Sequence, residues 1–146
     1  MTNVSLSVGA VMQPAGPEKG VGIVTSGYLK EQGDPAWRDD PGMEEFRGFL
    51  RARMPDADPA DANTVYGYSL GLTLMQVLRQ CAGDFSRENV MRQASGLRGV
   101  ALPTLLPGIV LDTSPTNYHP IRQMQLQRWD GQSWRRFGNI IEGANV

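Results

Sequence analysis

The sequence predicts an α/β fold that ends in a β-hairpin, and three observations support this prediction. A glycine-punctuated β run, GVGIVTSGY, occupies positions 20–28, and three segments with helical periodicity follow it. The C-terminal stretch MQLQRWDGQSWRRFGNII places a turn dipeptide between two strand-like runs. With 146 residues, of which 40% are hydrophobic and 20% charged, the chain can bury one ordinary core.

Composition excludes several classes of protein. Fourteen basic and fifteen acidic residues give a net charge of -1, so no global field favours nucleic acid or an anionic membrane as a partner. A single cysteine, Cys81, excludes an intramolecular disulfide, and with only one histidine we expect no zinc site. The N-terminal residues have no basic region followed by an apolar run, so no signal peptide is predicted. No segment reaches the roughly 18 apolar residues of a membrane span.

The first third of the chain predicts two short β segments and a helix. Residues 4–12 favour a short strand that runs into a helical turn, and residues 22–25 suit a buried strand. The glycines nearby do not form GxGxxG before a helix, so a dinucleotide site is not expected. Asp40 and Pro41 are typical of a helix start, and Pro55 ends the pattern. The apolar residues of this helix recur every three to four positions and predict one buried face: Met43, Phe46, Phe49, Leu50 and Met54.

The middle of the chain predicts two further helices. Residues 55–61, PDADPAD, read as a connector, and two apolar stripes follow over residues 63–82. Together these stripes cover most of the helix circumference, which predicts a helix packed on several sides. Ser86 is expected to cap the next helix, with Glu88 in its first turn. Four residues of that helix are expected to point inward: Val90, Met91, Ala94 and Leu97.

The last third predicts β structure. Residues 109–111 are strand-like, and Asp130-Gly131 is a strong hairpin turn. Met124 and Leu126 alternate with glutamines, which predicts one buried and one solvated face. Trp129 and Trp134 either form a cross-strand aromatic pair or an exposed recognition surface, and the pair is the commoner cause.

No catalytic or metal site is predicted from the residues. His119 could act as a general base, but no serine or cysteine motif accompanies it, and Pro120 beside it is typical of a loop. Cys81 is expected in the core rather than as a reactive thiol. The carboxylates at 39, 40, 44 and 45 favour helix-start stabilisation over an acid/base pair. The aspartates at 56, 58 and 61 could contact calcium, but their loop lacks the glycine and distal glutamate of a known calcium loop.

The order of these segments resembles a known family. The runs GIVTSGYLKEQGDPAWRDDPGMEEFRGFL, NTVYGYSLGLTLMQVLRQCAGDFSRENVMRQASGL and LPTLLPGIVLDTSPTNYHPIRQMQLQRWDGQSWRRFG resemble the C-terminal part of branched-chain amino acid ABC transporter substrate-binding proteins. These are type I periplasmic binding proteins. The resemblance implies part of a fold with two Rossmann-like lobes, joined by three crossovers, that trap a small ligand between them.

The resemblance also implies a domain layout. Residues 1–57 would be a second-lobe segment, 58–107 a first-lobe helical segment, and 108–146 a crossover and the second-lobe hairpin. Family members are usually more than twice this length, so the chain is expected to match roughly their last two-fifths. The apolar surface of the helix at 63–82 would then lack its sheet, and we expect partial instability, self-association or rearranged packing.

The resemblance places second-lobe ligand contacts at the segment of Ser5 and Ser7 and at Val21, just before the strand. In relatives that bind leucine, isoleucine or valine the last position is acidic and pairs with the ligand ammonium. Val21 cannot do so, and aromatic or aliphatic carboxylates therefore become as plausible as amino acids. Alternatively, Ser5 and Ser7 only cap the turn after a strand.

The resulting hypothesis is a solute-binding component of an ABC importer, not an enzyme. It would need no cofactor, act in the periplasm and pass a small ligand to permease subunits. A ligand-sensing regulatory domain of the same fold is the alternative. An enzyme on an α/β core is the weakest hypothesis, since the sequence shows no nucleophile, metal or phosphate motif.

Overall fold

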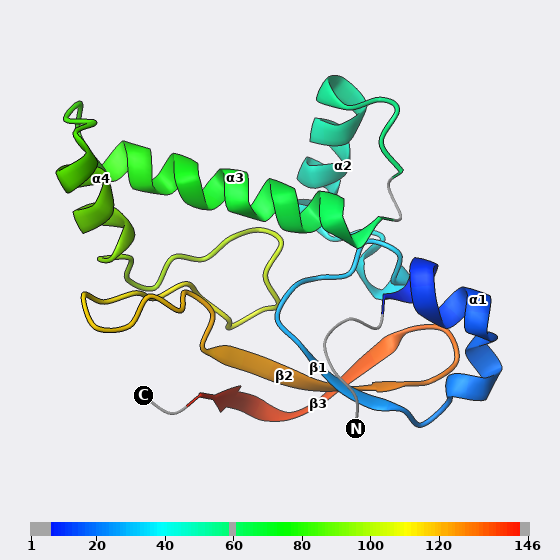
Figure 1. Ribbon diagram of the computed structural model, residues 1–146. Coiled ribbons are helices and arrows are strands. Elements are labelled where there is room, and N and C mark those ends of the chain that lie inside the picture. The colour runs from blue at the N-terminus through cyan, green and yellow to red at the C-terminus, as the bar shows by residue number, and fades with distance from the viewer. Residues whose placement is uncertain (1–6, 59–60, 144–146) are drawn as a thin grey trace.

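The chain forms a small antiparallel sheet on one side and a helical layer on the other (Figure 1). The computed structural model describes residues 7–58 and 61–143. The sheet has the order β1-β2-β3, with β1 Val24–Gly27, β2 Gln123–Trp129 and β3 Trp134–Glu142. The helices are α1 Gln13–Ala15, α2 Pro41–Arg53, α3 Ala62–Gln80 and α4 Arg87–Ala94. A π-helical turn, Val8–Met12, leads into α1, and 3-10 turns cover Pro17–Gly20 and Pro35–Trp37. No helix in the described part of the chain is long and apolar enough to cross a membrane.

The N-terminal segment differs from its prediction in register and burial. The helical part expected within 4–12 is present at Val8–Met12, whereas residues 4–6 lie outside the described residues. The buried strand predicted at 22–25 is present in part: Val24 and Thr25 lie in β1 and Thr25 is buried, but Gly22 has φ 90° in a turn, and Ile23 is 37% exposed. The physical reason is topology. β1 pairs only with β2 within the sheet, so it is an edge strand covered on few sides.

Helix α2 begins where the sequence predicts. The Asp40 side chain accepts a hydrogen bond from the Met43 backbone N–H at 2.9 Å, which satisfies a free donor of the first turn. Met43 and Phe46 are fully buried, and Leu50 is buried with them. Phe49 and Met54 are exposed, so the predicted buried face is narrower than the apolar pattern.

Helix α3 is covered on one side only. Its buried residues are Val65, Ser69 and Val77, and Ser69 hydrogen-bonds to the buried Thr104 at 2.6 Å. Figure 1 shows α2 near one end of α3, α4 at the other and loops beneath it. The opposite side, which we call the outer face, carries four exposed apolar residues: Tyr66, Leu70, Leu74 and Met75. The prediction that this helix packs on several sides is therefore wrong for the described residues, because no described segment covers the outer face.

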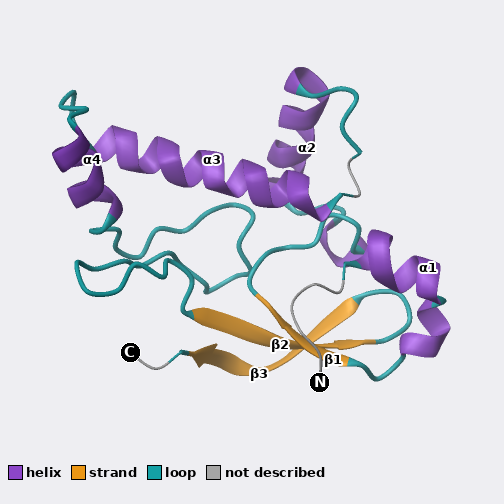
Figure 2. Ribbon diagram, in the orientation of Figure 1, coloured by secondary structure: helices purple, strands orange, loops and turns teal. Residues whose placement is uncertain are grey.

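The segment after α3 is partly as predicted. The Ser86 hydroxyl accepts from the Asn89 backbone N–H and caps α4. Met91 is exposed, and Asn89 is buried instead because its amide donates to the carbonyls of Cys81 and Asp84. Figure 2 shows loop throughout between α4 and β2. The strand predicted at 109–111 is wrong, since only Leu111 forms a bridge, with Val100, and the apolar residues pack as loop against Leu97 and Leu106.

The hairpin is confirmed, but its buried side is not the predicted one. Trp129 pairs with Trp134 across the strands, and the ring centroids lie 5.2 Å apart. Both rings are buried against Val8 and Met12, so the aromatic pair is structural. Gln127 is buried on the side of Trp129, whereas the side of Met124 and Leu126 is only partly covered. A register shift between those two residues and the packing of the N-terminal helical turn on the tryptophans explain the difference.

Candidate binding cavity

A cavity of about 390 Å³ lies at the C-terminal end of β1. Its volume falls in the range of small-molecule sites. Four parts of the chain line it: the turn that begins at Ser7, residues 25–32, the start of α3 at residues 61–65, and the hairpin through Gln127 and Trp134. The cavity therefore joins segments that the family resemblance assigns to different lobes.

Backbone pairing holds the floor of this cavity in place. After β1 leaves β2, residues 28–30 pair with residues 104–106. The Leu106 N–H donates to the Tyr28 carbonyl, and the Lys30 N–H donates to the Thr104 carbonyl, each at 2.8 Å. On the hairpin side, the buried Asp34 carboxylate accepts from the Trp134 N–H at 2.8 Å. Segments about 75 and 100 residues away in sequence thus fix both sides of the 28–34 loop.

Lys30 lines the cavity, but its charge is already paired. Its ammonium donates to both carboxylate oxygens of Asp40, at 2.8 and 2.9 Å, and to the Pro103 carbonyl at 2.7 Å. These three bonds use all three donors of a lysine. Burial alone would raise the pKa of Asp40, but the bonds from Lys30 and from the Met43 N–H outweigh it, and the pKa lies below its usual range.

Glu31 and Gln32, the next two residues, carry buried polar atoms without partners. Both carboxylate oxygens of Glu31 and both polar atoms of the Gln32 amide lack a hydrogen bond. Burial raises the pKa of Glu31 to about 7. The nearby backbone N–H groups of Gly33 and Val8 oppose this rise. Both residues line the cavity, although these four polar atoms are themselves buried.

The predicted contact residues lie in different places. Ser7 lines the cavity, and its side chain makes no capping hydrogen bond to the turn that follows. Ser5 lies outside the described residues. Val21 is 58% exposed and lies beside Gly131 at the hairpin turn, away from the cavity. Glu31 and Gln32 were not predicted, because in sequence they are two polar residues of a loop.

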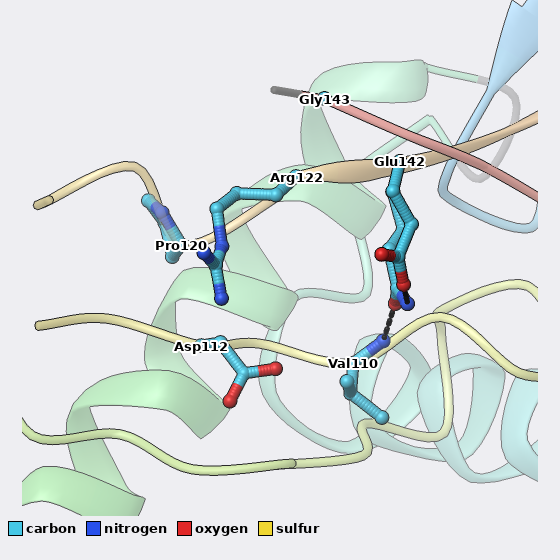
Figure 3. Close-up of a pocket in the computed structure, with 7 residues that line it drawn as sticks. Val110, Asp112, Pro120, Arg122, Glu142 and Gly143 are labelled. Atoms are coloured by element: carbon cyan, nitrogen blue, oxygen red, sulfur yellow. Dashed lines mark hydrogen bonds between the residues drawn. The ribbon is translucent and has the colours of Figure 1, made fainter. Parts of the chain in front are cut away.

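A second, smaller cavity of about 190 Å³ lies where the hairpin meets the preceding loop. Figure 3 shows Arg122 extending toward Asp112, and Val110 donating its N–H to the Gln123 side chain at 3.1 Å. Gln123 in turn donates to Glu142 at 2.9 Å. Those hydrogen bonds leave few free groups in the smaller cavity, and we regard the larger one as the candidate site.

The other candidate residues have structural surroundings. Cys81 is buried in the core, and His119 is exposed in its loop. Asp40 caps α2, and Glu44 pairs with Arg47 and Arg51 on its surface. Asp61 caps α3 by accepting from the Asn63 N–H at 2.9 Å. No three His, Cys, Asp or Glu side chains within residues 7–58 and 61–143 gather to hold a metal ion, so the calcium hypothesis has no support there.

Comparison with known proteins identifies the fold. No family model and no curated protein matches the sequence. Among solved structures, the chain matches a branched chain amino acid ABC transporter from Thermus thermophilus with bound valine, with a TM-score of 0.71 and 14% identity. The two share one fold. The match covers 92% of this chain and 36% of the other, so the chain spans about a third of that protein's length. It confirms the predicted fold: the chain is folded like part of that protein.

Proposed function

We propose that the chain is part of the solute-binding component of an ABC importer and holds a small solute in the 390 Å³ cavity. The position of this cavity supports the proposal most. It lies between residues 7–32, from the proposed second-lobe segment 1–57, and the start of α3, from the proposed first-lobe segment 58–107. Residues 108–146 return to the second lobe as the hairpin. A ligand bound there would touch both lobes, as closure around a solute requires.

The same proposal assigns partners and location. The solute would pass to membrane permease subunits, with no chemical step and no cofactor, and the protein would act in the periplasm. The fold shared with an ABC transporter protein supports these assignments. The proposed ligand is an amino acid or an aromatic or aliphatic carboxylate. Of the contacts that the family resemblance implies, we propose Ser7 for this cavity, since Val21 lies at the hairpin turn.

Isothermal titration calorimetry of the chain tests the proposal. The ligands are L-valine, L-leucine, 3-methylbutanoate and benzoate. We expect saturable binding of at least one of them, and Ser7→Ala should weaken it several-fold. Val21→Ala is the matched comparison: weakened binding there would move the ligand to the hairpin turn. Absence of binding by all four ligands would contradict the proposal.

We also propose that the outer face of α3 mediates self-association of this chain. Its four exposed apolar side chains are each about half exposed and form one apolar patch, a feature of interaction surfaces. No charged residue occurs between Ala62 and Leu78 to oppose contact. Light scattering after gel filtration should show a species larger than 16.0 kDa. Leu70→Glu should return it to a monomer, whereas Arg53→Glu on α2 should not. A monodisperse wild-type monomer would contradict this proposal.

A further inference from the structure

The carboxylate of Glu31 lies against the N-terminal turn Val8–Met12. Both of its oxygens are buried, and among the described residues neither has a hydrogen-bond partner. They lie 3.2 and 3.3 Å from the point that a Cβ on Gly33 would occupy, and the Gly9 backbone nitrogen lies 3.5 Å from the same point. The carboxylate is therefore enclosed between its own loop and the start of the turn, where water does not reach it.

The turn has little local structure of its own to hold it in place. It is π-helical, a rare conformation that is found mostly as single turns and often at functional sites. Its residues include a glycine and two valines, which are poor helix formers, and no side chain caps its start. Its position therefore depends on packing, since Val8 and Met12 are buried against the Trp129–Trp134 pair of the hairpin (Figure 1).

Neither the loop of Glu31 nor the start of α3 supplies a cation to compensate this carboxylate. Asp34, three residues further on, lies near enough to disfavour the charge on Glu31. The Lys30 ammonium is held by Asp40 at 2.8 Å. Asp61, at the start of α3, lines the same cavity and adds a negative charge. The turn itself has no titratable side chain.

The hairpin does not compensate the carboxylate either. Each of its three arginines has another partner: Arg128 lies over Phe137, Arg135 pairs with Asp130, and Arg136 lies over Trp37. An ionised carboxylate at position 31 would thus be buried without a counterion, which is unfavourable. Burial accordingly raises the pKa of Glu31 to about 7.

We propose that ionisation of Glu31 releases the turn from the hairpin. In the closed form, with the turn packed on the tryptophans, the neutral carboxyl group is tolerated. When the proton leaves, the charge is hydrated only if the turn moves away, and the turn has little structure of its own to oppose this movement. Ser7, Ala10 and Val11 form one wall of the cavity, so release also opens the cavity. That consequence for a solute rests on the proposed function, whereas the release itself does not.

The sign of the pH dependence follows from the pKa of Glu31 in the two forms. The carboxyl has a pKa of about 7 in the closed form and its ordinary value of 4.5 once it is hydrated. The closed form is therefore fully stabilised below pH 4.5 and loses this stability as the pH rises through about 7. Between these values the ratio of released to closed chains rises by up to about tenfold per pH unit, and by about seventyfold from pH 5 to pH 8.

Amide hydrogen exchange of the unmodified ¹⁵N-labelled chain tests the proposal without any ligand. The reporters are the Val11 and Met12 amides, which donate to the Ser7 carbonyl at 3.1 and 3.0 Å in the closed form. After correction for the intrinsic exchange rate, their protection should fall at least about thirtyfold from pH 5 to pH 8. The Cys81 amide, which donates to the Val77 carbonyl at the end of α3, should stay more strongly protected than either at both pH values, because the release is local.

Three outcomes of this experiment would overturn the proposal. The first is protection of the turn that does not change with pH, and the second is a turn that is already unprotected at pH 5. The third is protection of the turn equal to that of the Cys81 amide, because the turn would then open only when the whole chain unfolds.

Two variants then assign the effect to the residue. Glu31→Gln keeps the shape and cannot ionise, so protection of the turn should change by less than about threefold from pH 5 to pH 8. Glu88→Gln, at an exposed site on α4, is the control and should behave like the unmodified chain. Far-UV circular dichroism confirms that both variants are folded. A folded Glu31→Gln chain that keeps the full pH dependence would overturn the assignment to Glu31. Because no ligand is present, these outcomes are independent of whether the cavity binds a solute.

Discussion

Replacing Glu31 with glutamine should make the chain more stable at pH 8. Burial raises the pKa of this carboxyl from 4.5 to about 7. In the unfolded chain the carboxyl titrates at its ordinary value, so between pH 4.5 and pH 7 the native state holds a proton that the unfolded state has lost. The associated stability is fully present below pH 4.5 and is lost as the pH rises through about 7.

The size of the effect follows from the shift. Since one pKa unit corresponds to about 1.4 kcal/mol, the raised pKa of Glu31 lowers the free energy of unfolding by about 3 kcal/mol at pH 8. Glutamine removes the buried charge but keeps an unpaired amide, so we expect a net gain of about 2 kcal/mol. Near pH 4 the wild-type carboxyl is protonated, and the two proteins should differ by less than about 1 kcal/mol.

Urea unfolding followed by tryptophan fluorescence measures this gain at pH 4, 6 and 8. Comparing two proteins at one pH isolates Glu31, because Asp34, whose buried carboxyl also has a raised pKa, is present in both. Glu88→Gln, at an exposed site, controls for the loss of one negative charge. A Glu31→Gln protein that is less stable than wild type at pH 8 would refute the argument. So would a difference that stays constant from pH 4 to pH 8.

Two further predictions concern the join between the cavity and α2. Asp40→Ala should lower the free energy of unfolding by about 3 kcal/mol in a urea titration, because it removes a helix cap and leaves the buried ammonium of Lys30 without a counterion. The control Asp39→Ala, at an exposed site, should change the free energy of unfolding by less than about 0.5 kcal/mol. Equal effects of the two substitutions would contradict the structural role of Asp40. Gly42→Ala should lower the melting temperature, because a Cβ there would meet a backbone carbonyl of the loop after α4. Gly67→Ala on the outer face of α3 meets nothing within 4 Å and should stabilise by up to about 1 kcal/mol, and destabilisation there would show that the face is covered.

Local signals in the sequence were enough to predict the helix starts and the hairpin. Asp40 before a proline and Ser86 before a periodic run both cap helices as predicted, because capping involves only residues a few positions apart. Trp129 and Trp134 pair as predicted, because a turn dipeptide sets their register.

What the sequence could not predict depends on distant contacts. The helical periodicity of α3 predicts two apolar stripes. It does not predict that α3 packs on one side only, the side on which Ser69 contacts Thr104. Glu31 looks like a solvated loop residue, and its burial arises from the turn at Val8 and from pairing of the neighbouring Lys30 with Thr104. No local pattern encodes such long-range packing. The apolar run at 109–111 predicts a strand, but in the structure these residues pack as a loop. Apolar residues that pack without strand pairing show the same sequence pattern as a buried strand.

The central claim is that a small solute occupies the cavity at the end of β1. Two-dimensional ¹H–¹⁵N spectra of the labelled chain, titrated with L-valine, test it most directly. The account predicts saturable shifts centred on the backbone amides of Ser7, Gly27, Gln32 and Asn63, and on the Gln32 side-chain amide, all of which line the cavity. Shifts centred on the hairpin turn around Val21, or no shift at saturating L-valine, 3-methylbutanoate or benzoate, would contradict it.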